Sequence, residues 1–162
     1  MTNPKTKRRG RPSKAPPGVS PAAVREIRQM AKAYIDARLW VRYCENVRSS
    51  LLRRAGVEPQ RCGKAGRVTY NTDEVKGYPE KDRAVLYQYI TDKETVLCVE
   101  NGIASIENAV TREIAGKAIV EGKSCENIAS EIGISKRSVF REKDRAYRWI
   151  ADYAVKENLV RG

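Results

Sequence analysis

The stretch from residue 123 to residue 150 constrains the fold more than any other part of this chain. Ser124 precedes apolar residues at helical spacing, and Gly133 stands where a tight turn between two crossed helices needs a positive φ. Ser135 can cap a second, longer helix. The apolar stripe of that helix is Val139, Ala146, Ile150 and Tyr153, at spacings of seven, four and three residues. The stretch therefore predicts a short helix, a turn and a long helix.

This pattern is typical of a helix-turn-helix, whose second helix lies in the major groove of DNA with its N-terminal residues at the base edges. The second helix here begins with polar and basic side chains. An Arg side chain can bridge guanine O6 and N7, and Lys can reach the same atoms. The candidate DNA-binding residues are Ser124, Asn127, Ser135, Lys136, Arg137, Ser138, Arg141 and Arg145. A helical hairpin that touches no DNA is the alternative interpretation.

The closer resemblance is to region 4 of sigma factors. That family runs Ile-Ala, then Gly-x-Ser, then a β-branched core residue, then Arg-Ala. The matching residues here are Ile128–Ala129, Gly133–Ile134–Ser135, Val139 and Arg145–Ala146. The match covers about 40 residues and departs at Glu142–Lys143, where repressor-type motifs usually carry an apolar residue.

Basic charge is concentrated at the N-terminus of the chain. Of the formal net charge of +12, residues 1–20 contribute six basic and no acidic side chains, whereas residues 71–121 hold six basic and ten acidic ones. This distribution suggests a polyanionic partner for the two ends and a different role for the acidic middle.

Residues 1–20 are rich in Lys, Arg, Pro, Gly and Ser, which predicts a disordered basic arm. Within it, residues 8–12 resemble the core of an AT-hook, which lies in a narrow A·T minor groove with its Arg side chains on the groove floor. The residues expected to contact nucleic acid are Lys7, Arg8, Arg9 and Arg11. A nonspecific phosphate or RNA tether is the alternative.

Residues 21–121 predict a helical body. A first helix should begin after Ser20 and run to Arg54 or Ala55, with an apolar row at every fourth residue. That row is Ile27, Ala31, Ile35, Leu39, Tyr43, Val47 and Leu51. Gly and Pro residues punctuate a long loop at 56–79, with one short strand at 67–70.

Three further helices are expected before the two-helix stretch. One begins at Glu80 and runs to Ile90. A second starts at a capping box at Thr91–Glu94 and breaks near Gly102, and a third runs from 104 to 121 and ends at Gly122. The expected fold is therefore mainly α. It consists of an arm at 1–20, a helical body at 21–121 and a helix-turn-helix at 122–162.

Composition argues against a metal site, a membrane span and catalysis. Four cysteines lie at Cys44, Cys62, Cys98 and Cys125, with no C-x-x-C pair and no His in the chain, so we expect no metal and no cofactor. No signal peptide or long apolar run is visible, which favours free thiols in a reducing cytoplasm and no membrane contact. Without His, a phosphate-binding loop or a nucleophile motif, we expect no enzyme activity.

A region-4-like motif behind several helices and a basic arm resembles the late-gene transcription regulators of bacteriophages. One group is the late activators of phages of Gram-positive hosts, and the other is the Q-type antitermination proteins of lambdoid phages, in the version without a zinc ribbon. Chain length, the cysteine pattern and the lack of His suit the second group.

The resemblance implies binding to double-stranded DNA near a late promoter, and action with host RNA polymerase, its sigma factor and nascent RNA to suppress termination. Two alternatives stay open. The protein could activate late promoters without travelling with the polymerase, or it could be a small terminase-type DNA-packaging subunit that assembles into a large ring.

Overall fold

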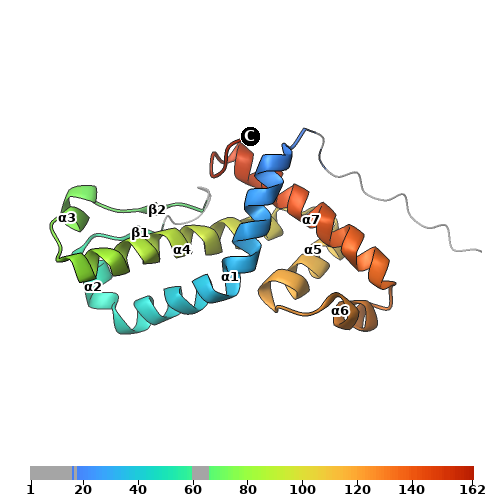
Figure 1. Ribbon diagram of the computed structural model, residues 1–162, viewed down its shortest axis with the longest axis horizontal. Helices are drawn as coiled ribbons and strands as arrows, with labels where there is room; N and C mark the ends of the chain where they lie inside the picture. Colours follow the sequence, from blue (N-terminus) through green and yellow to red (C-terminus); the bar gives the residue numbers. More distant parts are fainter. Residues whose placement is uncertain (1–15, 17, 60–65) are drawn as a thin grey trace, which may run out of the picture.

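The computed structural model describes residue 16, residues 18–59 and residues 66–162 (Figure 1). The chain is mainly helical over these ranges, as the sequence predicts. None of the helices described combines the length and hydropathy needed to cross a lipid bilayer. The predicted arm residues Lys7, Arg8, Arg9 and Arg11 lie outside the described residues.

The elements form two groups along the chain. The first contains α1 (Pro21–Val47), α2 (Ser49–Arg54), the antiparallel strands β1 (Glu58–Pro59) and β2 (Val68–Thr69), α3 (Thr72–Lys76) and α4 (Glu80–Ala104). The second contains α5 (Ala109–Ala115), the π-helical turn η1 (Gly116–Val120), α6 (Cys125–Ile132) and α7 (Lys136–Lys156). Figure 1 shows α2, α3 and the strands at one end of the molecule and α5, α6 and α7 at the other.

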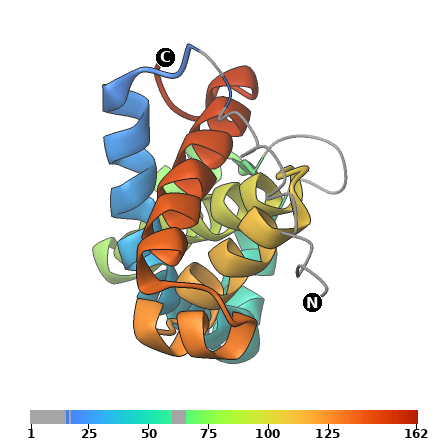
Figure 2. The same cartoon turned by 90° about the vertical axis from the view of Figure 1, so that its right-hand side faces the viewer.

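Helices α1 and α4 pack against each other along the fold, and α7 packs against both of them. The N-terminal half of α1 lies beside α7 in both views (Figures 1 and 2). Ala146 and Ile150 of α7 are fully buried in the same core as Ile27 of α1 and Val99 of α4. The long C-terminal helix is therefore anchored in the main core and does not form a separate unit.

The start of α1 was predicted correctly, because the signal is local. The Ser20 hydroxyl accepts a hydrogen bond from the Ala23 backbone N–H at 3.1 Å, and Pro21 occupies the first helical position. The predicted single helix is interrupted at Arg48, which leaves the helical conformation with φ −112° and ψ 20°. The Arg48 guanidinium pairs with Asp82 of α4 at 2.9 Å, so the break lies where α1 and α4 are joined by charge.

The apolar row predicted for the first helix lies only partly in the core. Ile27 and Leu51, at its two ends, are buried. Its middle members Ile35, Leu39, Tyr43 and Val47 have exposed fractions between 44% and 63%. A spacing of four residues advances about 40° beyond one full turn at each step, so such a row rotates off the core along a long helix. The buried face instead alternates three- and four-residue steps, through Tyr34, Ala37, Val41 and Cys44. The chain is left with an exposed row of large apolar side chains.

Three other boundaries differ from the prediction. Helix α4 is continuous through the expected capping box at Thr91 and through Gly102, while the expected helix at 104–121 starts only at Ala109. The region 56–79 is also more regular than a loop. The described part contains β1, β2 and α3, and the Asn71 side chain caps α3 by accepting from the backbone N–H groups of Asp73 and Glu74.

Buried tyrosines link α1 to α4 through carboxylates. The Tyr34 hydroxyl donates to Glu100 at 2.5 Å, and the Tyr89 hydroxyl donates to Glu45 at 2.9 Å. Lys93 also reaches Glu45, at 2.7 Å. Burial, reinforced by the hydrogen bond to Glu100, raises the pKa of Tyr34 to about 12, and burial with the bond to Glu45 raises the pKa of Tyr89 further.

We expect the protein to lose stability steeply between about pH 9 and pH 12. Burial also raises the pKa of the Cys44 and Cys98 thiols from 9.0 to about 11. The folded state therefore keeps protons that the unfolded chain releases, so these contributions are complete below pH 9 and vanish as pH rises through the folded pKa values. Urea unfolding across this range measures the slope, and Tyr34→Phe should make it shallower. A free energy of unfolding that stays constant to pH 12 would contradict this expectation.

Candidate nucleic-acid interface

Helices α6 and α7 are joined by a short turn whose geometry depends on two capping serines and one glycine. The Ser124 hydroxyl accepts from the Asn127 backbone N–H at 3.2 Å, and the Ser135 hydroxyl accepts from the Ser138 N–H at 3.1 Å. Gly133 ends α6 with φ 75° and ψ 35°, in the left-handed region. No atom would crowd a Cβ there, so the backbone conformation alone favours glycine.

A small hydrophobic cluster fixes this pair of helices against α5. Ile114 of α5, Ile128 of α6 and Val139 of α7 are fully buried and form a cluster separate from the main core. Ile132 and Ile134 pack against its edge. Because each helix contributes one side chain, the relative placement of α6 and α7 depends on these three residues.

Ion pairs at the surface add to this placement. Glu131 of α6 pairs with Lys117 of η1 and with Lys123, each at 2.9 Å. Lys136, at the start of α7, pairs with Glu126 of α6 at 2.6 Å. These side chains are solvent-accessible, and water screens their charges, so the pairs add little to stability. Their main effect is to orient the side chains.

The exposed face of α7 carries arginines in a regular row. Arg137 and Arg141 are exposed and have no ion-pair partner among the residues that the structure describes. Asp144 and Arg148 follow on the same face, at spacings of three and four residues. Phe140 lies next to this row with 54% of its surface exposed. The face therefore presents cations with one apolar ring, opposite the buried Val139.

The predicted residue Arg145 lies off this face. Its side chain is only 18% exposed and pairs with Glu142 one turn earlier. Glu142 in turn accepts from the Thr111 hydroxyl of α5 at 2.7 Å. Thr111 is fully buried, and Glu142 satisfies its hydroxyl group. Repressor-type motifs usually carry an apolar residue at the position of Glu142, so a polar contact here replaces an apolar one. This network positions α7 against α5.

The other predicted residues lie near the turn. Asn127, Ser135 and Lys136 are exposed, whereas Ser138 is half-buried and accepts a long 3.5 Å hydrogen bond from Arg141. Hydrogen bonding to Glu126 raises the pKa of Lys136, while the same contact lowers the pKa of Glu126. The ammonium at the start of α7 therefore keeps its charge and is held over α6.

Sequence reasoning missed Arg148 of α7. It noted Arg28 only as one of many basic residues on a first helix that could meet nucleic acid, with no link to α7. Asp144 pairs with both, and the Arg28 guanidinium lies 5.4 Å from the centre of the Tyr147 ring. The seven-residue spacing from Arg141 to Arg148 indicates that both lie on one face of a helix. Nothing in the sequence, however, indicates that Asp144 of α7 pairs with Arg28, 116 positions earlier. These contacts extend the basic surface from α7 onto α1.

No protein-family model, curated protein or solved structure matches this chain. Among the residues described, no group of three or more Cys, Asp or Glu side chains is arranged to hold a metal ion.

Proposed function

We propose that α6 and α7 form a helix-turn-helix that binds double-stranded DNA, with α7 as the recognition helix in the major groove. The observation that carries this proposal is the pair Arg137 and Arg141, exposed side by side on the first turns of α7 and free of ion pairs within the described chain. In helix-turn-helix proteins these first turns reach the base edges. The capped turn and the cluster of Ile114, Ile128 and Val139 would hold the face rigid.

Arg137→Ala and Arg141→Ala should each weaken specific DNA binding by about 1–3 kcal/mol, because each removes a bidentate contact to a base edge. The measurement is affinity for a duplex selected from a random pool, compared with a shuffled duplex of equal length. Arg53→Ala is the matched control, since Arg53 is an exposed arginine on α2, at the far end of the molecule (Figure 1). Full affinity in both α7 variants would mean that another surface reads the DNA.

We further propose that the protein is a phage late-gene regulator that acts with RNA polymerase as an antitermination factor. This part of the proposal rests on the resemblance of residues 123–150 to sigma region 4. It also requires that the chain bind RNA polymerase through a surface other than the DNA-binding face. The exposed apolar row of α1 supports such a partner, because contiguous apolar patches on soluble proteins commonly mark protein interaction sites.

A transcription assay with one promoter and a downstream terminator tests the choice of mechanism. An antitermination factor should increase read-through without changing the amount of promoter-proximal transcript. An activator of initiation should increase the promoter-proximal transcript and leave the fraction of read-through unchanged. If the protein changes neither quantity with purified polymerase holoenzyme, a direct action on transcription is rejected.

Leu39→Glu should separate polymerase action from DNA binding. Leu39 is 60% exposed in the middle of the α1 row, so the charge should leave the fold and the DNA affinity intact. A carboxylate at the centre of an apolar interface should cost about 2 kcal/mol or more of polymerase binding. Pull-down with polymerase holoenzyme measures this, with Tyr87→Glu on α4 as the control at an exposed position outside the row. Equal pull-down by both variants would exclude the row from the interface.

A further inference from the structure

We propose that a cleft between the start of α1 and the side of α7 binds the sugar-phosphate backbone of the duplex that α7 reads. This inference rests on the proposed DNA-binding function and adds a second contact site outside the two-helix motif. It assigns Arg25, Arg28 and Arg148 to phosphate contact. The sequence marked the first two only as part of a basic helix face and did not bring them together with Arg148.

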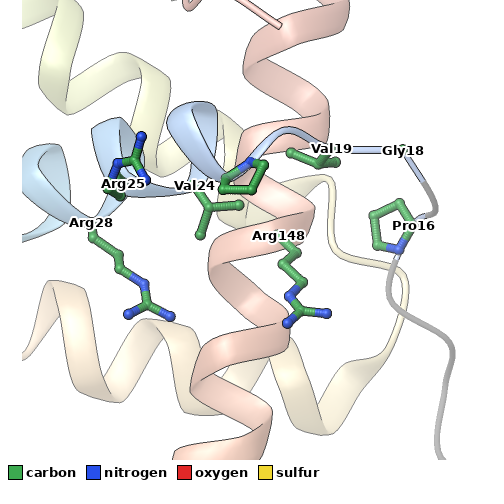
Figure 3. Close-up of a pocket in the computed structure, with 8 residues that line it drawn as sticks. Pro16, Gly18, Val19, Val24, Arg25, Arg28 and Arg148 are labelled. Carbon is green, nitrogen blue, oxygen red and sulfur yellow. The ribbon is translucent and has the colours of Figure 1, made fainter.

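The cleft has a basic rim and an apolar floor. Its volume is about 590 Å³, and its lining includes Val19, Val24 and the three arginines. Figure 3 shows the side chains of Arg28 and Arg148 extending in the same direction from two different helices. An arginine fork suits a phosphate, and an apolar floor suits the face of a deoxyribose, so the chemistry fits a nucleic-acid backbone.

Asp144 orients the two facing arginines without cancelling their charge. It pairs with Arg28 and, at 3.3 Å, with Arg148, so one carboxylate is shared by two guanidinium groups. Both arginine side chains remain about half exposed, at 49% and 52%. The Tyr147 ring beneath Arg28 adds a second support. The guanidinium groups are therefore held in place before binding, which lowers the conformational entropy lost when a phosphate arrives.

The cleft lies far enough along α7 from Arg141 to reach beyond the depth of the major groove. Arg148 lies seven residues beyond Arg141 on the same face, which corresponds to about 10 Å along the helix axis. The major groove of B-DNA is about 8.5 Å deep. If the first turns of α7 contact base edges, Arg148 should therefore reach the edge of the groove, where the phosphates run. Arg28 and Arg25 would extend that contact along the strand.

Salt dependence of DNA binding tests the inference, because each phosphate contact releases counterions. The affinity of the full chain for the selected duplex and for the shuffled duplex would be measured across a salt series. Arg148→Ala and Arg25→Ala should each reduce the slope of log K against log salt by about 0.9 and weaken both duplexes to the same degree. Arg148→Lys should keep the slope, and the distant Arg53→Ala should leave it unchanged. Thermal melting confirms that each variant is folded.

Three results would overturn the proposal, and they can be told apart. Unchanged slopes in both alanine variants, with Arg137→Ala still defective, would reject the cleft while leaving the proposed function intact. A loss confined to the selected duplex would show that Arg148 reads bases and not phosphates. A wild-type chain that binds neither duplex would reject the proposed function, and this inference with it.

Discussion

Ile128→Ala is expected to abolish specific DNA binding while leaving most of the helical fold in place. Ile128 is fully buried in the small cluster with Ile114 and Val139. Replacing a buried isoleucine by alanine typically costs 2–5 kcal/mol, from lost burial and from the remaining cavity. Because this cluster is separate from the main core, the loss should fall on the attachment of α6. A helix of eight residues is too short to persist alone, so α6 should open locally.

Hydrogen exchange resolves this local effect. The free energy of opening measured for the α6 amides should fall by the whole destabilisation caused by the substitution. The values for the α1 and α4 amides should stay near those of the wild type. Ile35→Ala provides the matched control, because it makes the same chemical change at a position that is 44% exposed. It should change stability far less and leave DNA binding intact. If protection drops equally in α4 and α6, the cluster is not an independent unit and the expected mechanism is wrong.

The parts of the fold that could be predicted from sequence depend on local signals. Ser20, Ser124 and Ser135 each cap a helix as expected, and Gly133 and Gly122 adopt the positive φ values that a helix end favours. Such features need only neighbouring residues, so a sequence pattern contains the whole of the physical cause. The exposed position of Arg137 and Arg141 follows from the same register, since it is set by the buried Val139 and Ala146.

The features that could not be predicted depend on contacts between distant segments. The capping box at Thr91 does not start a helix, because α4 continues through it while Ile90, Val96 and Val99 pack into the core. Arg48 ends α1 at a point where its guanidinium meets Asp82 on another helix. Likewise, the pairing of Arg28 with Asp144 depends on how α1 lies beside α7, which no local pattern specifies.

A close approach of α4 to α7 at Gly102 predicts the second large effect. Gly102 lies inside α4, and a Cβ there would stand 2.7 Å from Cγ2 of Ile150, which is fully buried. Gly102→Val should therefore destabilise the protein by about 1–3 kcal/mol or more, since two packed helices must separate. Gly102→Ala should cost less, because alanine favours a helix over glycine by about 1 kcal/mol and so offsets part of the clash.

A double-mutant cycle distinguishes a clash with Ile150 from an effect of the valine on α4 itself. Ile150→Ala alone should destabilise by about 2–5 kcal/mol through its cavity. Combined with Gly102→Val, it should cost clearly less than the sum, because the added methyl groups fill the space that the isoleucine leaves. Urea unfolding of the four proteins gives the coupling energy. Strict additivity would show that α4 and α7 do not meet at Gly102, and that the orientation of the Arg137 and Arg141 face is set elsewhere.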